Sequence, residues 1–257
     1  MPGNRTKVSI STCISSVMLM LCGVMCLFLP KAQAQGTLQL QGDIGFAVYN
    51  TPSIARTSDK NQSVLPYLYA DWGNLYARVD TYGYKVMPLG SGHLEFAARI
   101  SQEGFHSIYQ GIDSRSRPMP IGLGTSQETA YGAFFLYGFH DPVSGGQLFD
   151  GMYAAEFNAG SYQIYPQIGM ELRSARYTHH LYAVSPREAA LSGQLVYEPG
   201  NASSPYVGCA LEYPLSKDLK ISFQATRKWV GKTIGTSPLV NNASQVSGLI
   251  ALTTVFK

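Results

Sequence analysis

The chain has 257 residues, enough for one large domain or two small ones; 14% are charged and 12% are aromatic. Three of its 19 basic residues lie in the first 34 positions, so the rest of the chain carries 16 basic and 16 acidic residues and no net charge. This balance, without any run of Lys or Arg, excludes a basic surface for nucleic acid.

The first 34 residues predict a secretory signal peptide. Arg5 and Lys7 supply the positive start, residues 17–29 the apolar centre, and Ala32-Gln33-Ala34 a small-x-small cleavage site. A single-pass anchor is the alternative, but the apolar centre is shorter than the roughly 20 residues of a spanning helix. We expect cleavage between Ala34 and Gln35. A secreted chain without a later apolar helix is then either soluble outside the inner membrane or a closed β-barrel in a bilayer.

Alternating apolar and polar residues predict strands along the rest of the chain. In the N-terminal half, Leu94, Phe96 and Ala98 alternate with His93 and Glu95. We expect four strands there, at residues 38–48, 64–72, 75–80 and 94–100. The Pro and Gly residues of segment 87–92 indicate a loop.

The middle of the chain combines strands with two long connections. Residues 103–127 form an irregular stretch that contains Arg115, Arg117 and two prolines, and residues 176–203 form a second connection. The strands expected between these connections lie at 128–139, 148–158 and 162–175.

The last three expected strands have the clearest pattern. They lie at residues 204–213, 219–228 and 246–256. In the middle one, Leu219, Ile221, Phe223 and Ala225 alternate with polar residues that include Lys220, Gln224 and Lys228. Each strand has about the 9–11 residues that cross a bilayer at a tilt. The last strand ends on an aromatic residue, Phe256, as outer-membrane barrels usually do.

Together these elements predict an all-β protein: a transmembrane antiparallel β-barrel of ten strands, with twelve as the alternative, formed by residues 35–257. The strand count decides where segment 103–127 lies. With both termini on the periplasmic side, ten strands place it on that side too, although long connections normally face outward. Twelve strands, or a segment folded into the lumen, would remove this conflict.

No residue pattern indicates catalysis or a bound cofactor. His93, Glu95 and Arg99 share one polar strand face, which is typical of any barrel lumen. His179 and His180 lack a third residue at ligand spacing, and the chain contains no GxSxG, GxGxxG, P-loop or HExxH motif. Cys209, the single cysteine after the signal peptide, fits as a small hydrophobe. We therefore expect a protein that is not an enzyme and that holds neither metal nor cofactor.

Segments of the C-terminal half resemble the MltA-interacting protein (MipA/OmpV) family. Arg176-Tyr177-Thr178, Tyr182-Ala183-Val184-Ser185 and Glu188-Ala189-Ala190 resemble its "RY…YYGVS…AA" segment. The following strand and turn from Ser204 to Ser216, and the ending from Ser237 to Phe256, resemble it as well. Residues 38–100 match more loosely. The chain departs from the family at Ala183, where glycine is usual, at Lys257 after the terminal phenylalanine, and in region 103–127.

The resemblance implies an outer-membrane protein of a Gram-negative bacterium that scaffolds cell-wall enzymes. The namesake of the family bridges a murein lytic transglycosylase and a murein synthase, so these are the expected partners beside outer-membrane lipid. No catalytic residues belong to the family. A narrow selective channel and a surface adhesin are the alternative functions. We expect Arg115 and Arg117 to contact an acidic partner.

Overall fold

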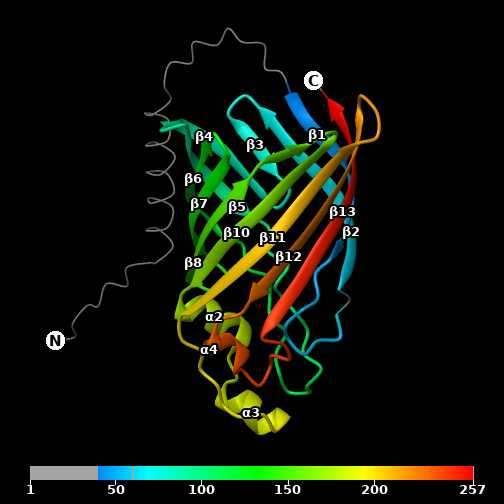
Figure 1. Ribbon diagram of the computed structural model, residues 1–257. Helices are drawn as coiled ribbons and strands as arrows, with labels where there is room; N and C mark the ends of the chain where they lie inside the picture. Colours follow the sequence, from blue (N-terminus) through cyan, green and yellow to red (C-terminus); the bar gives the residue numbers. More distant parts are fainter. Residues whose placement is uncertain (1–39, 60, 257) are drawn as a thin grey trace, which may run out of the picture. The chain divides into compact units, whose positions relative to one another are not determined.

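The computed structural model describes residues 40–59 and 61–256, which form a closed barrel (Figure 1). Its strands are β1 (Leu40–Asn50), β2 (Gln62–Trp72), β3 (Leu75–Arg78), β4 (Thr81–Leu89), β5 (Gly92–Arg99), β6 (Ile121–Thr129), β7 (Gly132–Asp141), β8 (Gly146–Ala155), β9 (Phe157–Ala159), β10 (Tyr162–Arg173), β11 (Ala202–Pro214), β12 (Leu219–Trp229) and β13 (Ser244–Phe256). The expected signal peptide, with its Ala34–Gln35 cleavage site, lies outside the described residues and stays a prediction.

Antiparallel pairing of consecutive strands builds the wall, and β13 closes it by pairing with β1, where Phe46 lies opposite Leu252. β8 and β9 both pair with β10 and form the two halves of one wall strand. The wall therefore has twelve strands. The antiparallel barrel expected from the sequence is confirmed, with the larger of the two strand counts.

The two strands missing from the count of ten are β4 and β6, and each lacks the usual signals. β4 continues through Pro88 after a register shift between Lys85 and Met87, in a segment that its Pro and Gly residues marked as a loop. β6 has no clear alternation, because its inward position Gly124 carries no side chain. The ring of Tyr137 packs there, 1.9 Å from where a Cβ would lie. Glycine is thus required by a neighbour on the next strand.

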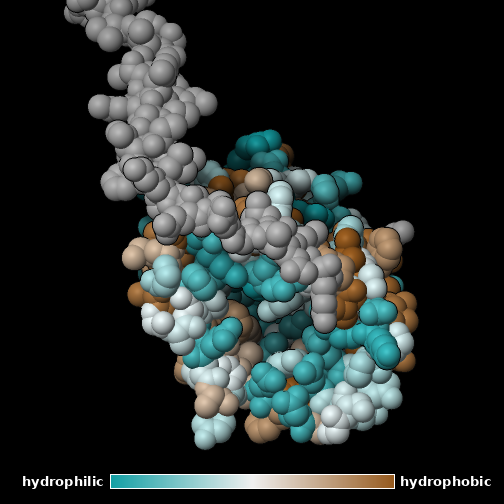
Figure 2. Space-filling view, turned by 90° about the horizontal axis from the view of Figure 1, so that it is seen from above, coloured by the Kyte–Doolittle hydropathy of each residue, from teal (hydrophilic) through white to brown (hydrophobic). Residues whose placement is uncertain are grey.

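The side-chain alternation sorts apolar residues outward and polar residues inward. On β12, Phe223 lies opposite Ile250 of β13, and both side chains are exposed on the outer surface. Lys220 and Lys228 of the same strand face inward and form ion pairs with Asp43 of β1 and Glu171 of β10. Figure 2 shows the result from the end that carries the short turns: hydrophilic residues surround a central hollow, and hydrophobic residues lie toward the outer edge.

Twelve strands place the four long connections at one end and the short turns at the other, except for the β3–β4 and β7–β8 turns. The short turns follow β2, β4, β6, β9 and β11 and share one rim with the start of β1 and the end of β13. The long connections, residues 51–61, 100–120, 174–201 and 230–243, share the other rim. Segment 103–127 therefore does not lie beside the short turns: its first part belongs to the long-loop rim and its remainder to β6.

The four long connections pack into a cap at their rim. Three helices belong to it, α2 (Ala175–Tyr182), α3 (Pro186–Ser192) and α4 (Lys232–Gly235). A hydrophobic cluster joins the connections through fully buried side chains, among them Phe105, Leu181, Val184 and Leu239. Among the described residues, no helix is both long and apolar enough to cross a membrane.

Candidate functional site

Ion pairs fill much of the barrel interior, and one group lies beneath the cap. Glu103, from the connection after β5, is 2.6 Å from Arg173 of β10 and 3.6 Å from Lys228 of β12. Glu171 of β10 pairs with the same two cations. The group is balanced, with two acidic and two basic side chains. Removing one partner would leave an uncompensated charge in a poorly hydrated place, which costs more than the pair itself contributes.

A second group of ion pairs lies near the short-turn rim. Lys220 is 2.6 Å from Asp43 and 3.3 Å from Glu212, so it links β12 to both β1 and β11. Asp71 accepts hydrogen bonds from Arg78 at 3.0 Å and Lys85 at 2.8 Å. Charged residues at both ends of the lumen are therefore largely neutralised by neighbours in the wall.

The strand face with His93, Glu95 and Arg99 does point inward, but its charged side chains are engaged separately. Glu95 is buried and accepts hydrogen bonds from Tyr137 at 2.7 Å and from Ser126 at 3.0 Å. Arg99 pairs with Asp150 at 2.7 Å. His93 lies opposite Ser126 in the β5–β6 register, but the Ser126 hydroxyl donates its hydrogen bond to Glu95. Among the described residues no hydrogen bond joins His93 to Ser126, as a nucleophile–base pair would need. Among the described residues no group of three or more His, Cys, Asp or Glu side chains could hold a metal.

The connection from residue 100 to 120 holds the cap together. Arg115 is 2.9 Å from Glu188 of α3 and donates a 2.8 Å hydrogen bond to the carbonyl oxygen of Ala183. Burial by itself raises the pKa of Glu188, but the hydrogen bonds that its carboxylate accepts from the Ser185 and Asp113 amides, together with Arg115, hold it below its usual value. These contacts of Arg115 join the connection 100–120 to the connection between β10 and β11.

The two arginines expected to contact a partner differ in exposure. The Arg115 side chain is 12% exposed, because Glu188 already binds it, whereas Arg117 is exposed. Both lie at the long-loop rim, on the opposite side from the short turns. His179 and His180 lie in α2, and the Nε2 of His180 is 2.9 Å from the carbonyl oxygen of Ser116. The sequence placed them in the connection 176–203, and the structure forms a helix there.

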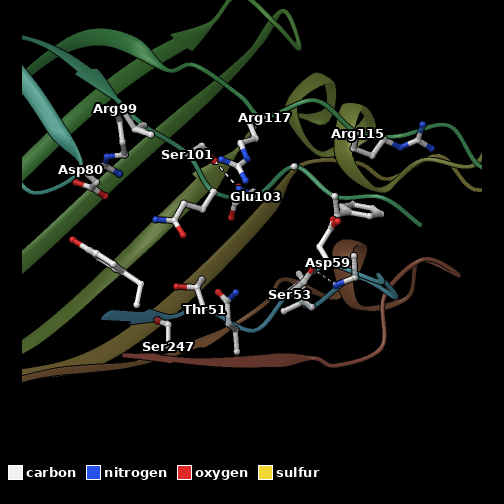
Figure 3. Close-up of a pocket in the computed structure, with 18 of the residues that line it drawn as sticks. Thr51, Ser53, Asp59, Asp80, Arg99, Ser101, Glu103, Arg115, Arg117 and Ser247 are labelled. Atoms are coloured by element: carbon white, nitrogen blue, oxygen red, sulfur yellow. Dashed lines mark hydrogen bonds between the residues drawn. The ribbon is translucent and has the colours of Figure 1, made fainter. Parts of the chain in front are cut away.

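A cavity of about 1100 Å³ lies between the cap and the interior of the barrel. Figure 3 shows side chains that line it, including Asp80, Arg99, Glu103 and Arg117. Hydroxyl and amide side chains make up much of the remaining lining, from Thr51 and Ser53 to Gln245. The periodicity of single strands gave no signal for this cavity, because its walls come from eight strands and the four long connections.

Comparison with known proteins supplies the identity. The family model described as MltA-interacting protein MipA matches residues 44–256, which is nearly the whole described barrel. The chain belongs to the MipA family. It is therefore an outer-membrane β-barrel of that family.

Individual relatives agree with this assignment. The MltA-interacting proteins of Escherichia coli strain K12 and of Shigella flexneri are each 28% identical over 166 residues, 64% of this chain. That match spans 65% of the length of these relatives. Outer membrane protein Omp26La of Vibrio anguillarum is 22% identical over 206 residues, 77% of this chain and 79% of the relative.

Proposed function

We propose that this MipA-family barrel is a non-enzymatic scaffold in the outer membrane of a Gram-negative bacterium, where it links a murein lytic transglycosylase to a murein synthase. The observation that carries the proposal is the family match over residues 44–256, together with the name of the E. coli relative, MltA-interacting protein. The interior supports it, since most of the charged groups that the structure describes there are paired with one another.

The short-turn rim is the surface that we assign to murein enzymes. In outer-membrane barrels short turns face the periplasm, where such enzymes work, and longer loops face outward. Side chains at this rim are exposed, among them Tyr131 in the turn after β6, 78% exposed, and Leu215 in the turn after β11, 50% exposed. Exposed aromatic and aliphatic side chains are the usual anchors of protein interfaces.

The long-loop rim is then the outer face. A contact between a partner and Arg115 or Arg117 belongs to this rim, where Glu188 already binds Arg115 and Arg117 lines the cavity beneath the cap. An acidic partner at this face would be an extracellular ligand, as the adhesin alternative requires. The scaffolding function is therefore assigned to the short-turn rim, and the adhesin function would require the long-loop rim.

Site-specific photocrosslinking in intact cells tests the proposal. A photoreactive phenylalanine analogue replaces Tyr131 or Leu215 at the short-turn rim, and Leu195, 79% exposed in the cap, serves as the matched control. We expect adducts with a lytic transglycosylase or a murein synthase from the first two positions and none from Leu195. Adducts with murein enzymes from no position, or with extracellular ligands from Leu195 alone, would refute the scaffold.

A further inference from the structure

The barrel wall is interrupted beside β2. β3 pairs only with the last four residues of β2, from Tyr69 to Trp72, and then turns back at Val79 and Asp80. The Val79 amide donates a 2.9 Å hydrogen bond to the carbonyl oxygen of Leu68, which places this turn level with Leu68. Within the described part of the chain, residues 62–67 of β2 therefore have no strand partner on this side.

The gap is framed on its other sides, and we call it the window. Its sill is the Val79–Asp80 turn, and its far edge begins at Ile100, whose amide donates a 2.8 Å hydrogen bond to the Asp80 carbonyl oxygen. On the cap side of the window, the hydroxyl of Thr57 donates a 2.7 Å hydrogen bond to the carbonyl oxygen of His106 and so joins the two connections. The window is thus a bounded gap in the strand pairing between β2, the end of β5 and two joined connections.

The cavity under the cap lies directly behind the window. Leu65, Pro66, Val79 and Ile100, which frame the window, all belong to the cavity lining. The outer surface beside the window is apolar. Ile100 is 60% exposed, and Val64, which lies farther toward the long-loop rim than the sill, is 67% exposed. The polar cavity and the apolar outer surface therefore meet at this gap in the strand pairing.

Two opposite charges in the cavity form no ion pair, although the Asp80 carboxylate accepts a 2.9 Å hydrogen bond from the Thr81 hydroxyl and lies beside Arg99 (Figure 3). Every other Asp, Glu, Arg, Lys and His of the lining forms an ion pair, whereas none connects Asp80 or Arg117 to another residue of the described barrel. Both side chains are exposed to the cavity, Asp80 on the window sill and Arg117 on the connection after β5 (Figure 3). The cavity thus offers one carboxylate and one guanidinium to a ligand.

We propose that the window admits the polar head of a membrane amphiphile into the cavity while the hydrocarbon chain stays in the bilayer. The head that fits is zwitterionic, of the phosphoethanolamine class. Arg117 would bind the phosphate, since guanidinium groups match phosphate geometry, and Asp80 the ammonium group. The unpaired edge of β2 favours the same occupant, because backbone groups at membrane depth need hydrogen-bond partners that a polar head or its water supplies. This proposal does not depend on the scaffolding function.

Photolabelling tests it with the full barrel in phosphatidylglycerol nanodiscs. The probe is lysophosphatidylethanolamine with a diazirine in its acyl chain, and the labelled residues are mapped by mass spectrometry. We expect labels concentrated at the window, around Val64 and Ile100. Asp80→Asn and Arg117→Gln should each reduce this labelling about tenfold or more, since each removes a charge-assisted hydrogen bond. Arg176→Gln and Glu198→Gln, exposed charges of the same rim outside this cavity, should leave it unchanged.

Competition separates the site from ordinary lipid contact. Unlabelled lysophosphatidylethanolamine should compete, and a lysolipid with a neutral glycerol head should compete at least about tenfold less. Labels spread evenly around the barrel would indicate annular lipid only and overturn the proposal. Equal competition by water-soluble glycerophosphoethanolamine would overturn it too, because the chain and the window would then contribute nothing. Equal losses in all four variants would likewise contradict the assigned roles of Asp80 and Arg117.

Discussion

Phe223 and its neighbour Gln224 show which face of β12 points outward and which points into the barrel. Phe223 lies on the outer face of β12, opposite Leu211 and Ile250, and 41% of it is exposed. Its sequence neighbour Gln224 points inward and donates a 3.3 Å hydrogen bond to Gln167. Two adjacent residues therefore lie in different surroundings, and substitutions at them should have different costs.

Phe223→Arg should make folding into bilayers less favourable by about 2–4 kcal/mol if the residue lies near the midplane, because a charge there is placed against hydrocarbon. Gln224→Arg is the matched control and should cost clearly less, since its side chain enters the polar interior. Urea titration of folding into phosphatidylcholine vesicles measures both. Equal costs would contradict the assigned orientation.

Glu188 gives a prediction about pH. Its folded-state pKa lies below the usual value, so its contribution to stability is complete above the pKa of an unfolded glutamate, about 4.3, and disappears as the pH falls through the lower folded value. The stability difference between the wild type and Glu188→Gln should be constant from about pH 5 upward and shrink below that. Urea unfolding across pH 3–7 measures it. The exposed Glu198→Gln is the control, and a difference that grows on acidification would contradict the prediction.

At the scale of elements, the connection between β5 and β6 joins the cap to the wall. It binds α3 through Arg115, the β1–β2 connection through His106, and the interior through Glu103. The amide of Met119 also donates a 2.7 Å hydrogen bond to Asp141 at the end of β7. A segment that composition alone described as irregular is thus among the most constrained connections of the molecule.

Glu103→Gln should loosen this connection, because the neutral side chain no longer compensates Arg173 and Lys228. Tryptic cleavage after Arg115 should become several times faster, while Pro118 protects the bond after Arg117. Time-resolved proteolysis of the folded barrel in detergent measures the rate. Glu128→Gln, an exposed acid on β6, should leave the rate at the wild-type value. An unchanged rate in Glu103→Gln would show that the other contacts of the connection suffice.

For the whole molecule, the interior argues against general diffusion. Inward tyrosines that include Tyr67, Tyr137 and Tyr206 are each less than a tenth exposed, and the cap covers one end. Barrel diameter grows with strand number, and twelve strands enclose far less space than the sixteen of porins. The narrow channel considered from the sequence would have to pass both the ion pairs and the tyrosines.

Planar-bilayer recordings should therefore show no stable conductance on the scale of a sixteen-stranded porin. A porin reconstituted in the same lipid is the positive control, and the Glu103→Gln variant tests whether the cap limits conduction. Brief small openings in that variant would agree with a cap held by Glu103. Large stable steps in the wild type would contradict the closed interior.

The sequence by itself determined the barrel class and the inward or outward direction of residues such as Lys220 and Phe223, because both depend on period-2 alternation within one strand. The tertiary structure decided what depends on distant neighbours. The alternation pattern did not reveal β6, because the ring of Tyr137 occupies the space that a side chain at position 124 would need. The location of residues 103–127 followed only from the full strand count. The pairing of Glu103 with Arg173, 70 positions along the chain, and the window beside β2 likewise arise from contacts that no local pattern records.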